Sequence, residues 1–205
     1  MASDAQPLEP PNRELLARAA AGDPGAFGLV YQHYQHVVYR FGLQMTASRD
    51  AAEDITQEVF VTLFRDLGRY DPSRASFTTY LYGIVRNLSR ERLRRDRRFI
   101  SLHGIGLGTR ESVEASPFDT IDGAQAAAGV REALRQLPPR YRELIVMCDL
   151  HGLSYADAAK VVDISVPAVR SRLHRGRQLL RDHWSRIMRT APSRAMATKR
   201  CAYDV

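Results

Sequence analysis

The chain has 205 residues, of which 44% are hydrophobic, and a formal net charge of +7. This composition is that of a folding protein and excludes wholesale disorder, and no apolar run approaches the roughly 20 residues that a membrane-spanning helix needs. Cys148 and Cys201 are the two cysteines, too few for a disulfide framework, so we expect free thiols. The N-terminal segment lacks the basic and apolar regions of a secretory signal, which predicts a cytoplasmic protein without membrane insertion.

Residues 1–11 contain three prolines and are predicted to form a disordered leader. Beyond them, periodic apolar residues predict a first helical domain over residues 12–98. Its helices are expected at about 12–21, 24–45, 49–67 and 76–97.

Residues 99–124 hold four glycines and a proline without a sustained period, which predicts a flexible linker. A second helical domain is expected over residues 125–189, and residues 190–205 are expected to form a basic tail. The helices of this domain are predicted at about 125–137, 139–150, 155–162 and 166–189. The predicted fold class is therefore all-α, with two small helical domains joined by the linker.

In the first domain, the helix at 49–67 has two different faces. Its buried stripe is predicted to consist of Ala52, Ile55, Val59 and Leu63. Its other face carries Glu53, Asp54, Gln57 and Glu58. Taken alone, this stretch is typical of a solvated acidic face. On a DNA-binding protein, however, an acidic face repels phosphate and is available to a protein partner with basic residues.

The helix at 76–97 combines aromatic, amide and basic side chains. Its buried stripe is predicted to be Phe77, Leu81, Ile84 and Leu88, and a second face carries Tyr80, Arg86, Asn87, Arg90 and Arg94. Rings that stack on bases, beside arginines, suit single-stranded DNA. The alternative is that Tyr80 and Tyr82 complete the core and that Asn87 forms a local cap.

In the second domain, the stretch SYAD at Ser154 is a capping box, in which the Ser154 hydroxyl accepts from the N–H of Asp157 and that carboxylate returns to the Ser154 backbone. A second cap at Ser165, with Pro167 in the first turn, opens the next helix. Two short helices joined by a tight turn predict a helix-turn-helix.

The second of these helices is predicted to contact DNA. Its apolar stripe consists of Val169, Leu173, Gly176, Leu180, Trp184 and Ile187. Residues 165–200 hold ten basic residues against the single acid Asp182, so the other faces offer donors and cations to phosphates and bases. The candidate DNA contacts are Arg170, Ser171, Arg172, His174, Arg175 and Arg177. The alternative is a solvated amphipathic helix.

Three motifs in this order resemble the extracytoplasmic-function (ECF) group of the bacterial sigma-70 family. They are AEDITQEVF at 52–60, FTTYLYGIVRN at 77–87 and GLSYADAAKVVDISVPAVRSRLHRGR at 152–177. Tyr80 stands where the family usually has tryptophan. The resemblance implies a sigma factor that binds core RNA polymerase and directs promoter-specific initiation.

The same resemblance implies a role for each motif. Glu53, Asp54, Gln57 and Glu58 would dock on the β′ clamp helices, and the implied contacts with polymerase also include the β flap. Tyr80, Arg86, Asn87, Arg90 and Arg94 would melt the minus-ten element and hold its single strand, and the third motif would read the minus-thirty-five element. The implied control is an anti-sigma factor, in a stress or envelope response.

The alternative to a sigma factor is a helix-turn-helix regulator that binds DNA without joining polymerase. No phosphate-binding loop, nucleophile elbow or catalytic cluster is present in the sequence, so we expect neither an enzyme nor a cofactor. His33 and His36 lie one helical turn apart, as do Cys148 and His151, but the pairs fall in different domains and no metal is expected.

Overall fold

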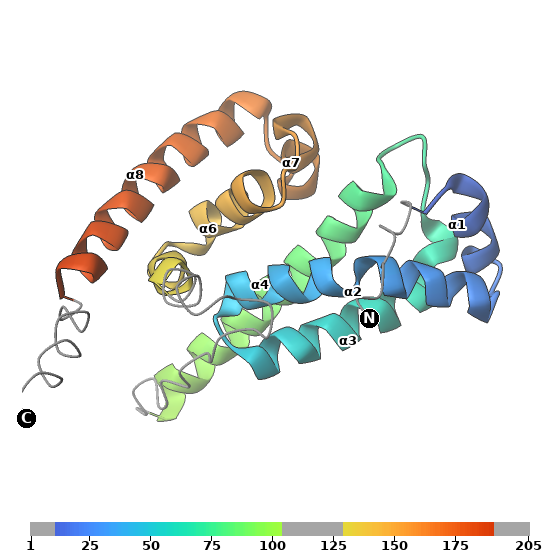
Figure 1. The fold of residues 1–205 in the computed structure, drawn as a ribbon, viewed down its shortest axis with the longest axis horizontal. Coiled ribbons are helices and arrows are strands. Elements are labelled where there is room, and N and C mark those ends of the chain that lie inside the picture. The colour runs from blue at the N-terminus through green and yellow to red at the C-terminus, as the bar shows by residue number, and fades with distance from the viewer. Residues whose placement is uncertain (1–10, 104–128, 191–205) are drawn as a thin grey trace, which may run out of the picture.

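The computed structural model describes residues 11–103 and 129–190 (Figure 1). The expected leader up to residue 10, the linker from residue 104 onward and the tail from residue 191 lie outside the described residues. Within the described ranges there are helices and turns but no strand, in agreement with the all-α prediction. No helix in these ranges is long and apolar enough to cross a membrane.

The first helical unit consists of α1 (Arg13–Ala20), α2 (Pro24–Thr46), α3 (Arg49–Asp66), the short 3-10 turn η1 (Leu67–Arg69) and α4 (Phe77–His103). Side-chain caps fix the starts of its first three helices. Asn12 accepts from the backbone N–H of Leu15, Asp23 from those of Gly25 and Ala26, and Ser48 from that of Ala51. These caps satisfy backbone donors that have no partner inside the helix.

Helix α4 extends farther than the sequence predicted. It ends at His103, so residues 99–103, which were assigned to the linker, are helical. The reason is local. No glycine or proline interrupts the arginine-rich stretch between Gly83 and Gly104, and ion pairs one turn apart, Arg92 with Asp96 and Arg95 with Glu91, support the helix.

Helices α2 and α3 pack closely at one point, where Gly42 of α2 faces Ala52 of α3. A Cβ added at Gly42 would lie 3.3 Å from the Cα of Ala52, so the two backbones approach closely there and an added side chain would have to displace one of them slightly. Phe41 and Met45, close to Gly42 in α2, and Leu63, farther along α3, are fully buried and form part of the hydrophobic core.

The second unit begins with a helical segment at residues 129–135. It continues with α6 (Pro139–Ile145), the π-helical turn η2 (Val146–Leu150), α7 (Tyr155–Val162) and α8 (Val166–Thr190). The helix expected over 139–150 therefore changes to π geometry in its last turn. Asp163, in the left-handed conformation with φ 57°, ends α7 and begins the turn into α8.

The capping box of α7 forms only in part as predicted. Ser154 accepts from the backbone N–H of Asp157 at 3.0 Å. The Asp157 carboxylate, however, accepts from the Ser154 hydroxyl at 2.6 Å and from the Thr79 hydroxyl of α4 at 3.2 Å. A residue expected to serve its own helix thus also connects the two units.

The two units pack against each other. Helix α7 contacts α4, and both α6 and η2 contact α2. In Figure 1, α8 lies on the outer side of the second unit, away from the first. The arrangement therefore leaves α8 open and covers part of α4.

Candidate nucleic-acid and protein-binding surfaces

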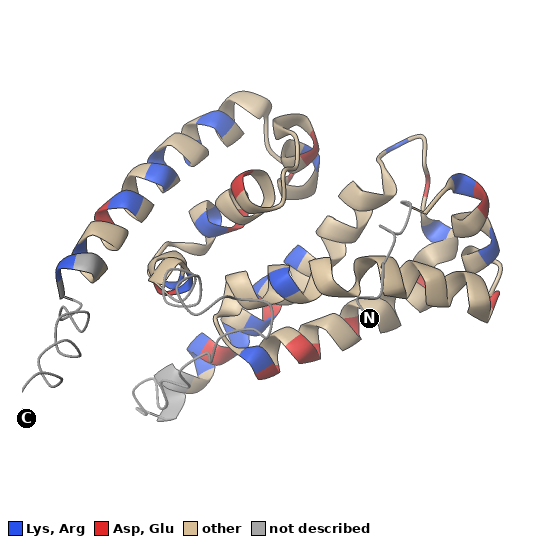
Figure 2. Ribbon diagram, viewed as in Figure 1, with Lys and Arg blue, Asp and Glu red and all other residues tan. Residues whose placement is uncertain are grey.

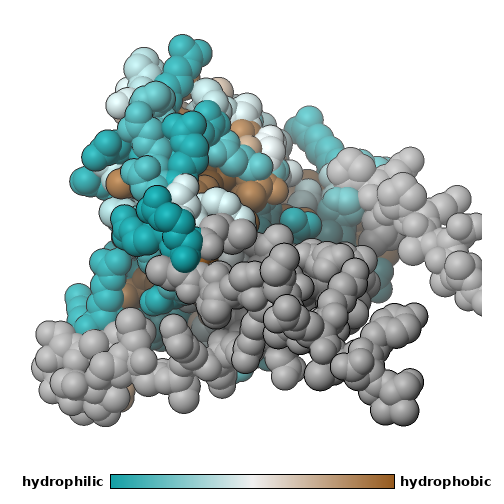
Figure 3. Space-filling model, turned by 60° about the vertical axis from the view of Figure 1, so that its left-hand side comes forward, coloured by the Kyte–Doolittle hydropathy of each residue, from teal (hydrophilic) through white to brown (hydrophobic). Residues whose placement is uncertain are grey.

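Helix α8 has the two faces that its sequence predicts. Val169, Leu173 and Gly176 are buried, and a Cβ at Gly176 would lie 3.0 Å from Ile145 of α6. Leu180 and Trp184, farther along the same stripe, are half-buried. Basic residues recur along the helix (Figure 2), and hydrophilic residues cover most of the described surface when the end of α8 is turned toward the viewer (Figure 3).

Most of the predicted DNA-contact residues of α8 are exposed. Arg172 is half-buried, and the exposed members are Arg170, Ser171, His174, Arg175 and Arg177. Arg175 donates to Gln178 at 3.3 Å, and Gln178 contacts His174 at 3.0 Å. These three side chains form a hydrogen-bonding strip near the solvent. A base edge can therefore take over their hydrogen bonds to one another at little cost in free energy.

Arg177 is exposed but is held by other side chains of the protein. Its guanidinium donates to both carboxylate oxygens of Asp149, at 2.6 and 2.9 Å, and to the Tyr155 hydroxyl at 3.3 Å. The hydrogen bond to Asp149 raises the pKa of Arg177 above its usual range. Arg177 therefore connects η2, α7 and α8, and a phosphate contact from it stays a prediction.

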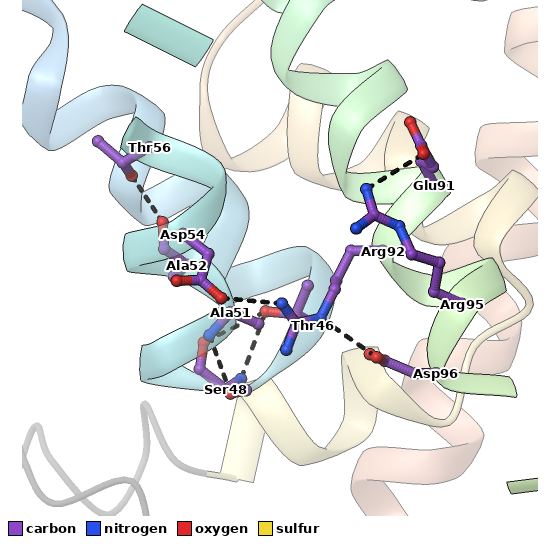
Figure 4. Close-up of polar contacts among 10 residues, drawn as sticks. All are labelled: Thr46, Ser48, Ala51, Ala52, Asp54, Thr56, Glu91, Arg92, Arg95 and Asp96. Atoms are coloured by element: carbon purple, nitrogen blue, oxygen red, sulfur yellow. Dashed lines mark hydrogen bonds and ion pairs between the residues drawn. The ribbon is translucent and has the colours of Figure 1, made fainter. Parts of the chain in front are cut away.

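Helix α3 buries the stripe that the sequence predicted and exposes the acidic face. Glu53, Asp54, Gln57 and Glu58 are all exposed. Asp54 is not isolated, because Arg92 of α4 donates to it at 2.9 Å and to Asp96 at 3.2 Å (Figure 4). This exposed ion pair holds Asp54 beside α4 and is easily broken by a competing cation.

A groove of about 320 Å³ runs between α2 and the acidic face of α3. Its lining residues are Tyr31, Gln35, His36, Tyr39, Glu53, Thr56 and Gln57. One and two turns beyond Gln57, the α3 face becomes apolar, with Val61 66% and Phe64 61% exposed. Two aromatic contacts, Phe27 with Phe64 and Tyr31 with Phe60, support this end from α2. The surface thus offers acids at one end and a large apolar area at the other.

The buried stripe of α4 differs from the prediction. Phe77 and Leu81 are buried as expected, but Ile84 and Leu88 are only half-buried, whereas Tyr82, Val85 and Ser89 are buried. Thr79, which does not belong to the predicted buried stripe, is also buried. The cause is that α4 packs on the first unit along one side and on the second unit along another, which the period of a single stripe cannot reveal. For Tyr82, the core interpretation is therefore the correct one.

Tyr80 lies in an aromatic cluster beside the loop before α4. Its ring centre is 5.4 Å from that of Tyr70 and 6.5 Å from that of Phe77, and its hydroxyl donates to the Asp66 carbonyl at 3.4 Å. Burial raises the pKa of Tyr80. The half-buried ring is therefore held in place, with part of its surface open to a stacking base.

The predicted DNA-binding arginines of α4 fall into two groups. Arg94 is exposed, and so is Asn87, which accepts from Arg86 at 3.3 Å. Arg86 and Arg90, in contrast, point to Glu143 of α6, with nitrogen to Oε2 distances of 2.9 and 3.6 Å. The Arg86 side chain is 12% exposed and that of Glu143 is 1% exposed. The second unit therefore covers part of the face that was predicted to bind single-stranded DNA.

His151, at the end of η2, forms a second bridge between the units. Its Nδ1 lies 2.7 Å from the Tyr82 hydroxyl, and its Nε2 lies 2.8 Å from Oε1 of Gln44. A neutral ring satisfies both, donating from Nε2 and accepting at Nδ1. Burial, followed by the charge of Arg40, lowers the pKa of His151 to about 4.

Arg142, next to Glu143, also connects the two units. It donates to the carbonyls of Met45 in α2 and of Leu137 in the second unit. Burial is the main cause that lowers the pKa of Arg142 to about 10.

Cys148 is half-buried with a free thiol, and burial raises the pKa of this thiol to about 11. Among the described residues, no group of three or more His, Cys, Asp or Glu side chains could hold a metal ion.

Two family models match the parts of the chain that form these surfaces. Residues 30–99, which contain α3 and most of α2 and α4, match sigma-70 region 2. Residues 128–180, from before α6 into α8, match sigma-70, region 4. The ECF sigma factor SigM of Mycobacterium tuberculosis is 30% identical over 172 residues, which cover 82% of each chain. The chain belongs to the sigma-70 family, in its ECF group.

Two further comparisons show how much of this sigma-family chain is shared with similar proteins. The ECF sigma factor SigE of Mycolicibacterium smegmatis is 34% identical over 170 residues, which cover 80% of this chain and 65% of SigE. This chain therefore spans less than two thirds of that relative's length. CnrH, solved in complex with the cytosolic domain of CnrY, is 25% identical with a TM-score of 0.63, covering 89% of this chain and 99% of CnrH.

Sequence reasoning missed Glu143, His151 and Arg142 as contacts between the two units of this sigma-family chain. A signal was present for two of them. Arg142 and Glu143 directly precede the apolar run LIVM, and both are buried. Charged residues on a buried helix surface need partners, so they indicate a charged or polar contact from another element. His151 carries no such signal, because it follows η2 in a turn.

Proposed function

We propose that this chain is a promoter-specificity subunit of bacterial RNA polymerase. It binds the core enzyme, directs it to promoters with minus-thirty-five and minus-ten elements, and helps to open the DNA. It acts in the cytoplasm as an initiation factor, not as an enzyme. The observation that carries the proposal is that one chain presents both a basic helix-turn-helix face on α8 and an acidic face on α3.

Recognition of the minus-thirty-five element is assigned to α8. The strip of Arg175, Gln178 and His174 offers donors and acceptors to base edges. Arg170 beside it is exposed and suits a phosphate. Because α8 lies on the outside of the second unit, its contact face is open to duplex DNA (Figure 1).

Polymerase docking is assigned to α3 and the groove beside it. A partner with a basic residue would pair with Asp54 in place of Arg92, which breaks one exposed ion pair to form another. Val61 and Phe64 continue the same helix face, so apolar residues of the partner can cover them. Exposed apolar side chains next to charges are typical of protein interfaces.

Single-stranded minus-ten DNA is assigned to the Tyr80, Asn87 and Arg94 face of α4, extended by Arg86 and Arg90. Tyr80 supplies a stacking surface, and the arginines supply charge along the strand. We also propose control by an anti-sigma factor in a stress or envelope response. The likeness to CnrH, which was solved with a second protein bound, supports such control.

The proposal is tested by footprinting genomic DNA fragments with bacterial core polymerase, the chain, and both together. We expect protection of two separated elements, with an unpaired segment at the downstream one, only when both are present. Protection by the chain alone, unchanged by polymerase, would instead identify a helix-turn-helix regulator, which the basic α8 face also permits.

A further inference from the structure

We propose that Gln178 is a positioning residue for base recognition by α8. It holds Arg175 and His174 so that both present hydrogen-bond donors to two neighbouring bases, one of them a guanine. The inference rests on the proposed function in one respect, the assignment of α8 to duplex DNA. It adds the kind of base that the helix selects and a side chain, outside the predicted contact residues, that organises this selection.

Gln178 lies about one helical turn beyond the two side chains that it contacts. Side chains of an α-helix lean toward the helix N-terminus, so a residue at position 178 reaches back to positions 174 and 175. Arg175 donates through Nη1 to Oε1 of Gln178 at 3.3 Å, and Nε2 of Gln178 lies 3.0 Å from Nε2 of His174. Gln178 is half-buried, whereas Arg175 and His174 are exposed. The inner residue of the three therefore supports the two outer ones.

The chemistry of the amide decides the direction of these hydrogen bonds. A guanidinium only donates, so the Gln178 oxygen faces Arg175 and the Gln178 nitrogen faces His174. An amide nitrogen also only donates, so Nε2 of His174 is the acceptor and the neutral ring carries its proton on Nδ1. The strip thus presents the Nδ1–H of His174 and further N–H groups of Arg175 as donors.

Donors select bases that present acceptors in the major groove. Guanine offers O6 and N7 side by side there, which match the fork of an arginine, whereas cytosine offers only an amino donor. Arg175 therefore fits a guanine. His174 directly precedes Arg175 in the helix, so its single donor fits a neighbouring base that presents an acceptor and disfavours cytosine.

The support that Gln178 gives differs from that of an ion pair. Arg177 is held by both carboxylate oxygens of Asp149, and this partner neutralises its charge. The amide of Gln178 is neutral, so Arg175 keeps its charge for a base edge. Holding the two side chains in place also reduces the conformational entropy that they lose when DNA binds. The contact therefore favours recognition without competing with DNA for the cation.

The test starts from a duplex that the full chain selects from a random pool. Gln178→Met removes both hydrogen bonds and keeps a side chain of similar length. Gln136→Met is the matched control, because Gln136 lies outside α8 and its Nε2 donates to Glu132, one turn away, at 3.1 Å. Each base pair of the selected sequence is inverted in turn. Fluorescence anisotropy then gives the ratio of affinities for the selected and the inverted duplex, which is the discrimination at that position.

We expect Gln178→Met to lower the discrimination about threefold or more at two neighbouring positions, because each unsupported side chain must be ordered on binding. These should be the positions at which His174→Ala and Arg175→Ala act, with a G·C pair at the second. Gln136→Met should leave the discrimination unchanged, and both methionine variants should melt close to the wild-type temperature. In a chain that carries both alanine changes, Gln178→Met should have no further effect.

Unchanged discrimination in Gln178→Met would overturn the inference. A loss that persists in the chain with both alanine changes would make Gln178 a direct DNA contact and overturn its positioning role. An A·T pair at the Arg175 position would overturn the selection of guanine.

These outcomes are separate from polymerase docking, which the footprint measures. A chain that behaves as expected but gives no polymerase-dependent footprint would retain this inference and remove the proposed function. A pool that yields no preferred duplex would remove the assignment of α8 to an upstream element, and this inference with it.

Discussion

Glu143 of α6 pairs with Arg86 of α4 at 2.9 Å, although only 1% of the Glu143 side chain is exposed. The pair joins a residue of the segment that matches sigma-70 region 4 to a residue of the segment that matches region 2. A family chain whose two regions would both contact a promoter thus holds them against each other. The contact therefore joins the packing of the two units to a residue that is assigned to single-stranded DNA.

Closure, by which we mean the packing of the second unit on the first, should weaken at acid pH because of His151. Its pKa is about 4 in the closed chain, against an ordinary value of 6.5, and it should return toward 6.5 when the units separate. The neutral ring therefore favours closure fully above about pH 6.5, and this contribution is lost as the pH falls toward 4. From pH 7 to pH 5 the closing equilibrium should weaken roughly twentyfold.

The radius of gyration, followed from pH 7 to pH 5, measures this effect. His151→Gln is the control, because an amide does not titrate and can still bridge Tyr82 and Gln44. Its radius of gyration should stay nearly constant. Equal expansion of both proteins on acidification would show that another group is responsible.

Asp54→Arg should abolish binding to core polymerase. The change replaces an attractive charge with a repulsive one on the docking face and places it beside Arg92. Glu91→Arg is the matched control, because it makes the same charge change at an exposed residue of α4 that pairs with Arg95. Co-purification with tagged polymerase should fall at least tenfold for Asp54→Arg only. Retained binding would show that this acidic face is merely solvated and does not contact polymerase.

Arg175→Ala and Arg177→Ala should have different effects, although both arginines lie on the exposed side of α8. Arg175 is positioned to read a base, so its loss should weaken binding to the preferred duplex by about 1–3 kcal/mol and less on other sequences. Arg177 is tied to Asp149 and Tyr155, so its loss should chiefly lower thermal stability. Equal losses from Arg175→Ala on all duplexes would make it a phosphate contact.

The parts of the fold that follow from local sequence could be predicted. Helix α7 begins and ends where Ser154 and Asp163 require, and the acidic face of α3 is exposed because its apolar partners recur at helical spacing. The end of α4 was placed too early because glycine-rich sequence beyond Gly104 lowered the expectation for the residues before it. Helix propensity predicts the interior of a helix more reliably than the residue at which it ends.

The contact between the units could not be predicted from periodicity. Thr79 and Arg86 look like surface residues on α4, and they are covered only because residues about 60 to 80 positions later pack on them. Such long-range pairing depends on how two finished units fit, which no local pattern encodes. The DNA-contact face of α8 was easier to predict, because one helix carries both the buried stripe and the contact face.

Gly42→Val should destabilise the first unit. A Cβ at residue 42 would lie 3.3 Å from the Ala52 Cα, so the added methyl groups must push α2 and α3 apart, at a cost of roughly 1–3 kcal/mol. Gly28→Val, on the same helix, is the control, because nothing lies within 4 Å of its added Cβ. Urea denaturation should show the loss for Gly42→Val alone. Equal midpoints would mean that the helices can separate there without strain.

Run-off transcription tests the central claim most directly. Bacterial core polymerase is combined with the wild-type chain or with Asp54→Arg, on templates that carry the footprinted fragments. We predict discrete transcripts that start just downstream of the minus-ten element, with the wild-type chain and not with Asp54→Arg. Transcription that is absent with the wild-type chain on every template, or equal without it, would contradict the assignment of this chain as a sigma factor.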